Sequence, residues 1–348
     1  MRNQALSARR RFPNVRRPML GPVKEGGTHV ENKVEKTAFG PVPSRRLARS
    51  LGINNIPPKI CPYSCVYCQL GRTSRLRIER GEFYEPDKIL RDVGDKVRQA
   101  RRRGEAIDYL TFVPDGEPTL DLHLGEEIKR LRQIGLKIAV ITNSSLLWRT
   151  DVREDLRLAD WVSLKVDAVS PDVWKRVNRP HGSLSLGRIL EGLSEFTRVF
   201  KGELATETML IQGFNDCPEE IEKISVFVAG LKPKKSYISV PIRPPADKWV
   251  HSPDEHSLNL AHQVFSEKLI DTELLIGYEG NAFSFTGNVE EDLLSIMSVH
   301  PMREDAVYEF LKKAQADTST VKRLVRSGQL VERRYKDRIF YLRKLPNS

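Results

Sequence analysis

An alternation of short apolar runs with longer amphipathic segments restricts the fold of this chain most strongly. Five runs are short, rich in β-branched residues and almost continuously apolar, as is typical of parallel strands covered on both faces. They are IDYLTFV (107–113), KIAVIT (137–142), WVSLKV (161–166), LATETMLI (204–211) and SYISVPI (236–242). Helical patterns lie between them at residues 86–102, 124–135, 185–200 and 217–231. Repeated β–α units predict an α/β fold, either a parallel barrel or an open doubly wound sheet.

The end of the chain has a different character. A helix and the strand ELLIGY (273–278) are expected to close the core. Residues 303–314 and 317–330 then resemble two helices, and residues 331–344 alternate like a hairpin. Two helices followed by a basic hairpin predict a small winged-helix-like module. We therefore expect three parts: a basic, disordered leader (1–37), a barrel domain (38–285), and a helical and winged-helix-like basic module (286–348).

Charge and composition limit the class of protein. The 348-residue chain has a formal net charge of +11. Residues 1–36 and 301–348 each carry +6, so the middle of the chain is almost neutral. Basic ends suit contact with a polyanion, although a solvated arm explains the leader equally well. The sequence has neither an apolar run near the roughly 20 residues of a membrane span nor a secretory h-region, and its four cysteines do not form a disulfide framework. We expect a protein of the reducing cytoplasm without membrane contact.

Three of the four cysteines lie within eight residues, in ICPYSCVYCQLGRT. Cys61, Cys65 and Cys68 have the spacing C-x3-C-x2-C, and a structural zinc site normally needs a fourth ligand. Three thiolates from one short loop are instead suited to a [4Fe–4S] cluster with one iron left open. The alternatives are a zinc site completed from elsewhere in the chain and three buried cysteines without a metal. We favour the cluster because the tetrahedral zinc set is incomplete.

This triplet, with Tyr67 before its last cysteine, resembles the signature of the radical S-adenosylmethionine (SAM) superfamily. The segments FGPVPSRRLARSLGI (39–53) and DGEPTL (115–120) are most similar to the group that contains the wyosine-forming tRNA enzymes and their uncharacterised relatives. The resemblance spans residues 38–280 and implies a partial (β/α)6 TIM-like barrel. It also implies that Cys61, Cys65 and Cys68 hold the cluster, and that the open iron binds the methionyl part of SAM.

The resemblance further implies a set of SAM-binding residues. Gly116 and Glu117 match the last two positions of a Gly-Gly-Glu motif that receives the methionyl amino group, whereas Asp115 replaces its first glycine. Glycine permits close backbone approach, and a carboxylate pairs with an ammonium. The remaining candidates follow successive strands or the cysteine loop: Tyr67, Asn143, Ser144, Lys165, Asp167, Ile211 and Asn215. For Asn143 and Ser144, helix capping is an equal alternative.

The chemistry implied by the resemblance is reductive cleavage of SAM to a 5′-deoxyadenosyl radical, which abstracts a hydrogen atom from a substrate. An external electron donor of the ferredoxin or flavodoxin type is then required. The wyosine enzymes carry further N-terminal cysteines for a second cluster, and this chain has only Cys217 outside the triplet. That departure argues against wyosine synthesis itself. Four residues are candidate substrate contacts, although solvated charge is the default for each: Arg45, Arg46, Arg179 and His181.

The basic residues near the C-terminus suggest contact with nucleic acid or a protein partner; they are Lys322, Arg323, Arg326, Arg333, Arg334, Lys336 and Arg338. Tyr335 or Phe340 would then stack on bases. Three functions follow: a radical SAM enzyme acting on RNA, one acting on a protein or small metabolite, and a non-catalytic iron–sulfur sensor that binds DNA. The barrel strands and Glu117 argue against the sensor, which needs no SAM pocket.

Overall fold

A single curled sheet organises the chain. The computed structural model describes residues 36–268, 270–277, 280–281 and 283–344. Eight of its strands form the sheet, in the order β1-β2-β5-β6-β7-β8-β9-β10. These strands are β1 (Ala38–Ser44), β2 (Ala48–Ile53), β5 (Tyr109–Phe112), β6 (Lys137–Thr142), β7 (Trp161–Lys165), β8 (Glu203–Met209), β9 (Lys235–Ser239) and β10 (Thr272–Leu275). β1 pairs antiparallel with β2, and the other seven strands run parallel.

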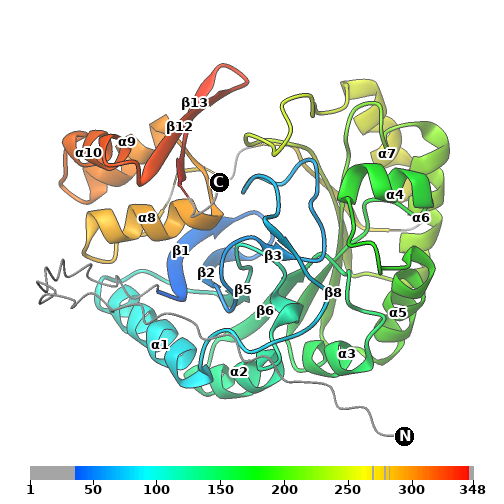
Figure 1. Cartoon of the computed structure of the whole chain (residues 1–348), viewed down its shortest axis with the longest axis horizontal. Helices are drawn as coiled ribbons and strands as arrows, with labels where there is room; N and C mark the ends of the chain where they lie inside the picture. The colour runs from blue at the N-terminus through cyan, green and yellow to red at the C-terminus, as the bar shows by residue number, and fades with distance from the viewer. Residues whose placement is uncertain (1–35, 269, 278–279, 282, 345–348) are drawn as a thin grey trace, which may run out of the picture. The chain divides into compact units, whose positions relative to one another are not determined.

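Helices follow the parallel strands and cover the outer side of the sheet (Figure 1). They are α1 (Pro86–Arg102), α2 (Leu124–Leu131), α3 (Thr150–Leu156), α4 (Pro171–Asn178), α5 (Leu186–Val199), α6 (Pro218–Leu231) and α7 (Glu255–Glu267). Strand order runs from β1 to β10 without closure in the described residues, so the sheet is an open, partial barrel. The predicted α/β partial barrel is confirmed. No helix in the described ranges combines the length and apolar character needed to cross a membrane.

The predicted elements agree with the observed ones where hydrophobic periodicity is strong. Strand β6 and helix α1 have the predicted bounds, and helix α2 continues as a short 3-10 turn that ends at Gly135 with φ of 78°. Helix α3 was not predicted, because only two of its seven residues are buried and its sequence TDVREDL is mostly charged. The antiparallel strand β1 was also not predicted. Most of the predicted leader, residues 1–35, lies outside the described residues.

Strand periodicity sends alternate side chains to the outer and inner faces of the sheet. The outer face packs against α1–α7 in one large core that includes Val140, Val162 and Leu164. On the inner face, Trp161 packs with Ala139 and Ala205 in a smaller apolar cluster. Two positions further along the two neighbouring strands β7 and β8, the inner face becomes polar. The barrel interior therefore has an apolar layer next to a layer of charged side chains.

The C-terminal elements pack beside β1 (Figure 1). They are α8 (Val289–Val299), β11 (Met302–Arg303), α9 (Glu304–Lys313), α10 (Ser319–Arg326), β12 (Leu330–Tyr335) and β13 (Arg338–Arg343), whose strands form a sheet in the order β11-β13-β12. A separate apolar cluster joins α8, α9 and α10 to Phe39 and Val42 of β1. Two predicted helices and the predicted hairpin are thus present, while their winged-helix type stays a prediction. Phe340 is only 2% exposed, so it packs internally and, contrary to our expectation, offers no face for stacking on a base.

Candidate active site

The cysteine loop follows β2 and is held from two sides. One side is the short strand β3 (Ile60–Cys61), which pairs with β4 (Arg75–Leu76). The other side is the C-terminal end of α4. The amides of Ser64 and Val66 donate to the carbonyl oxygens of Asn178 and Val177, each at 3.0 Å. These backbone hydrogen bonds fix the loop without using the thiols, which stay available as ligands.

The three thiols of this loop are half-buried neighbours. The Asn143 side-chain amide donates to Cys61 Sγ at 3.1 Å, and the Asn178 amide lies 3.5 Å from Cys65 Sγ. Burial raises the pKa of each thiol, and the nearby thiols raise those of Cys61 and Cys65 further. In the part of the chain that the structure describes, no three His, Cys, Asp or Glu side chains are arranged to hold a single metal ion. Cys217 is exposed and precedes α6, apart from the loop.

A polar cavity of 280 Å³ opens beside Cys68, inside the partial barrel. Its walls come from the cysteine loop, the β1–β2 turn, the segment after β5, and the ends of β8 and β9. Six of the residues selected from the sequence contribute to the lining: Arg45, Arg46, Tyr67, Cys68, Gly116 and Lys165. We call this space the central cavity. It lies at the carboxyl ends of the parallel strands, where barrel enzymes place their active sites.

Four side chains form a charged network on one wall of the central cavity. Lys165 and Glu207 are register partners on β7 and β8, and their side chains are 2.9 Å apart. Glu207 also accepts a hydrogen bond from the Ser239 hydroxyl at 3.0 Å and pairs with Arg46. Burial lowers the pKa of Lys165. The network brings fixed positive and negative groups to the cavity, a suitable arrangement for orienting a zwitterionic ligand.

A second network joins the cavity to the cysteine loop through Asp167, which is 4% exposed. Asp167 accepts hydrogen bonds from the Tyr67 hydroxyl, the Asn178 amide at 2.7 Å and the Met209 backbone amide at 2.9 Å. Lys165 lies 3.9 Å from Asp167, which agrees with the expectation that the two residues point to the same side of the strand. Because Asn178 also contacts Cys65, Asp167 positions both Tyr67 and a side chain that touches the triplet.

Gly116 allows the segment after β5 to touch the cysteine loop directly. The Glu117 amide donates to the Ile60 carbonyl oxygen at 3.2 Å. A Cβ atom on Gly116 would overlap that oxygen and lie 2.8 Å from Ile56 Cδ1. The close backbone approach that the motif predicted is therefore present, and in this structure its partner is the cysteine loop.

We expect Gly116→Ala to destabilise the protein by about 2–3 kcal/mol, because a methyl group in this contact forces the two backbones apart. Chemical denaturation should show a lower midpoint for this variant. Gly187→Ala is the control, since a Cβ there meets no atom within 4 Å and an alanine in a helix is at least as favourable. Equal midpoints for wild type and Gly116→Ala would contradict the packing argument.

Glu117 is buried, and its carboxylate is surrounded by donors of the chain itself. Its oxygens accept hydrogen bonds from the hydroxyls of Thr119 and Thr142, each at 2.6 Å, and from the Asn143 amide at 2.8 Å. Burial raises the pKa of Glu117, and these donors oppose the rise. The carboxylate thus holds Asn143, whose side chain reaches Cys61. Its contact with a SAM amino group stays a prediction.

Comparisons with known proteins identify the family. A family model described as the radical SAM superfamily matches residues 55–225. The chain is also 46% identical over 310 residues to a UPF0026 protein of Methanocaldococcus jannaschii, covering 88% of this chain and 96% of the relative. The chain belongs to the radical SAM superfamily. Members of this superfamily are enzymes that use SAM and a [4Fe–4S] cluster, so the family resemblance and the prediction of an enzyme are confirmed.

The chain resembles solved structures of radical SAM enzymes, and one of them shows the same fold. A radical SAM methyltransferase from Sphaerobacter thermophilus matches with a TM-score of 0.50 and 16% identity, covering 65% of this chain and 66% of that one. TYW1 with a lysine–pyruvate adduct bound matches with a TM-score of 0.48 and 20% identity, covering 63% of this chain and 73% of that one. At 16% identity, the similarity to the Sphaerobacter thermophilus methyltransferase shows a shared fold and nothing more.

Eight residues predicted to bind SAM or substrate do not line the central cavity: Glu117, Asn143, Ser144, Asp167, Arg179, His181, Ile211 and Asn215. The last four contact other parts of the chain. Ile211 is fully buried in an apolar cluster with Val66, and Asn215 hydrogen-bonds the backbone of residues 167, 209 and 211. Arg179 pairs with Asp247 at 2.6 Å, and the His181 amide donates to the Pro62 carbonyl oxygen at 2.8 Å. Their contacts hold the cysteine loop and the barrel rim. Ser144 has φ of 67° and a buried hydroxyl without a hydrogen-bond partner in the described residues.

Sequence reasoning missed two polar residues near the central cavity and the cysteine loop, Glu207 and Asn178. Glu207 lies inside the apolar run LATETMLI. A charged residue within a buried strand needs a functional reason, and the same argument had selected Lys165. Asn178 lies at the end of α4, a helix that was not predicted. Its contacts with Cys65 and Asp167 depend on a loop and a helix that meet only in the folded chain.

Proposed function

We propose that this protein is a radical SAM enzyme that holds a [4Fe–4S] cluster through Cys61, Cys65 and Cys68 and binds SAM in the central cavity. The observation that carries the proposal is the meeting of three half-buried thiols with a charged cavity at one end of the barrel. Soft thiolate ligands suit iron–sulfur clusters. Amide donors reach two of the sulfurs, as is usual around ligated thiolates, so the donor set fits the cluster.

The bound cluster and SAM together supply one-electron chemistry that ends in hydrogen abstraction from a substrate. The residues of this chain would bind and orient SAM and shield it from water. Lys165 and Arg46 bring positive charges and Glu207 a negative charge to the cavity wall, where they would orient SAM, while Glu117 stays the predicted partner of its amino group. The apolar cluster around Trp161 closes the barrel below the cavity and excludes water from that end.

Electrons would come from an external donor of the ferredoxin or flavodoxin type. For the substrate, the polar cavity and the basic C-terminal elements favour RNA over a protein or small metabolite. The two helices and hairpin at the C-terminus are proposed to be of the winged-helix type. A sensor that binds DNA without catalysis is disfavoured, because a switch would not need the charged network beside Cys68.

We expect the reconstituted, reduced protein to convert SAM to 5′-deoxyadenosine and methionine. Anaerobic reconstitution, reduction with dithionite and chromatography of the nucleosides measure this directly. A reaction without reductant is the control, and it should give only background product. A fully iron-loaded sample that yields no 5′-deoxyadenosine would show that the proposed function is wrong.

A further inference from the structure

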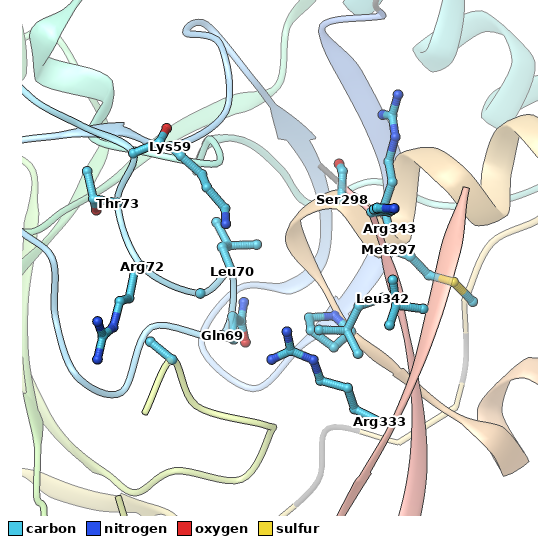
Figure 2. Close-up of a pocket in the computed structure, with 16 residues that line it drawn as sticks. Lys59, Gln69, Leu70, Arg72, Thr73, Met297, Ser298, Arg333, Leu342 and Arg343 are labelled. Carbon is cyan, nitrogen blue, oxygen red and sulfur yellow. The ribbon is translucent and has the colours of Figure 1, made fainter. Parts of the chain in front are cut away.

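A second cavity, of 370 Å³, lies between the cysteine-loop segment 69–74 and the hairpin β12–β13 (Figure 2). We call it the basic pocket. Five of its lining residues are cationic, namely Lys59, Arg72, Arg333, Arg343 and Lys344, and no described Asp or Glu lines it. Gln69 and Leu70 line both this pocket and the central cavity. A ligand in the basic pocket would therefore lie one wall away from the proposed SAM site.

Four of these five cations have no ion-pair partner among the residues that the structure describes. Arg72 pairs with Asp247 at 2.8 Å. The structure, over the residues it describes, gives Lys59, Arg333, Arg343 and Lys344 neither an ion pair nor a side-chain hydrogen bond. An anion in the pocket would face several charged donors at once, and hydrogen bonds between charged groups are the strong ones.

Of the four cations, Lys59 gives the strongest indication that the pocket binds an anion. It is only 7% exposed, and its backbone is held by hydrogen bonds to Asp115 and Arg75 at 2.7 and 3.3 Å. Its side chain points into the basic pocket toward Leu70, and Arg333 extends from the opposite wall (Figure 2). Burying a cation beside another cation is costly unless an anion completes the site.

We propose that the basic pocket binds a phosphate group of the substrate, so that the substrate is a nucleotide, either free or within an RNA strand. Several Lys and Arg donors around one cavity suit a phosphate, and guanidinium groups bind it bidentately. Met297, Val331 and Leu342 add apolar walls beside the cations, as a nucleoside attached to the phosphate requires. The inference depends on the proposed function only in calling the bound nucleotide a substrate. Binding of its phosphate group needs neither SAM nor an electron donor.

Arg333→Gln tests the proposal, with Arg334→Gln as its matched control. Adjacent residues of a strand face opposite sides, both arginines are exposed, and only Arg333 lines the pocket. Full-length, cluster-reconstituted protein is titrated, without SAM or reductant, against a fluorescein-labelled single-stranded RNA, with AMP and inorganic phosphate as competitors. We expect Arg333→Gln to weaken RNA binding about 5- to 10-fold and to reduce the salt slope by about 1. Arg334→Gln should change affinity less than about 2-fold.

The competitors distinguish the two sources of phosphate. Competition by AMP at the concentrations at which RNA binds would indicate a free nucleotide, whereas tight binding of RNA alone would indicate a strand; both support the proposal. Equal losses in the two variants, or no phosphate-dependent binding, would overturn it. The proposal is also wrong if Arg333→Gln slows reduction by a flavodoxin without changing binding of RNA or AMP. SAM cleavage by the wild type is measured separately, so failure of the proposed function is recognised independently.

Discussion

Replacing any one of Cys61, Cys65 and Cys68 with alanine should abolish cluster binding and lower SAM cleavage by more than about 100-fold. Loss of a partner that only orients a metal ligand typically costs about 10- to 100-fold in metal affinity or activity, and loss of a ligand removes more. The three thiols share one loop, so two remaining ligands leave the cluster incompletely held. Iron and sulfide content, visible absorption and 5′-deoxyadenosine formation measure the effect.

Cys217→Ala is the matched control for this experiment. Cys217 is exposed and precedes α6, away from the cysteine loop. Its variant should keep the iron content and the cleavage rate of the wild type. Circular dichroism would show that the triplet variants still fold, since β4 and the C-terminal end of α4 hold the loop through backbone hydrogen bonds. Full iron loading of a triplet variant would contradict the ligand assignment.

A buried carboxyl pair should make the stability of the protein depend on pH. Glu127 of α2 and Asp121 are 1% and 0% exposed. Burial above all, with repulsion from Asp121, raises the pKa of Glu127 to about 10, while the Asn55 amide opposes this rise. Burial also raises the pKa of Asp121. The pair therefore keeps a proton at neutral pH, whereas the unfolded chain releases it.

Glu127→Gln should remove most of this dependence. In the wild type the folded chain binds a proton that the unfolded chain loses above pH 4.5, so stability is full below that pH and falls as the pH rises toward 10. The loss is about 1.4 kcal/mol per pH unit. Glutamine imitates the protonated carboxyl, so the variant should gain about 4 kcal/mol over the wild type between pH 6 and 9. Urea denaturation at fixed pH values measures the difference.

Glu126→Gln is the control for the pH experiment, because Glu126 is the exposed neighbour of Glu127 on the same helix. Its ion pair with Arg130 lies at the surface, so the change should stay within about 1 kcal/mol at every pH. If the free energy of unfolding of the wild type and of Glu127→Gln changed equally with pH, the Asp121–Glu127 pair would ionise in the folded protein as it does in the unfolded chain, which would contradict the prediction.

The β–α alternation was sufficient to predict a parallel α/β sheet, because strands buried on both faces are almost continuously apolar. The choice of a partial barrel over an open doubly wound sheet came from the family resemblance. Hydrophobic periodicity similarly located α1, α6 and the C-terminal hairpin. It failed for α3 and α4, which are short and bury few side chains. Strand β1 lacked the signal of a buried strand, since Gly40, Pro41 and Pro43 interrupt its sequence.

The sequence by itself determined the family and predicted the cysteine ligands, because ligand chemistry needs a fixed spacing within one loop. Only the tertiary structure decided which polar residues surround that loop. Glu207 meets Lys165 because β7 and β8 pair in register, and Lys59 meets Arg333 because the C-terminal hairpin packs against the cysteine loop. Such contacts join residues as many as 274 positions apart. The local sequence pattern indicates the periodicity of each helix or strand. Which helices and strands pair with one another depends on the packing of the whole chain.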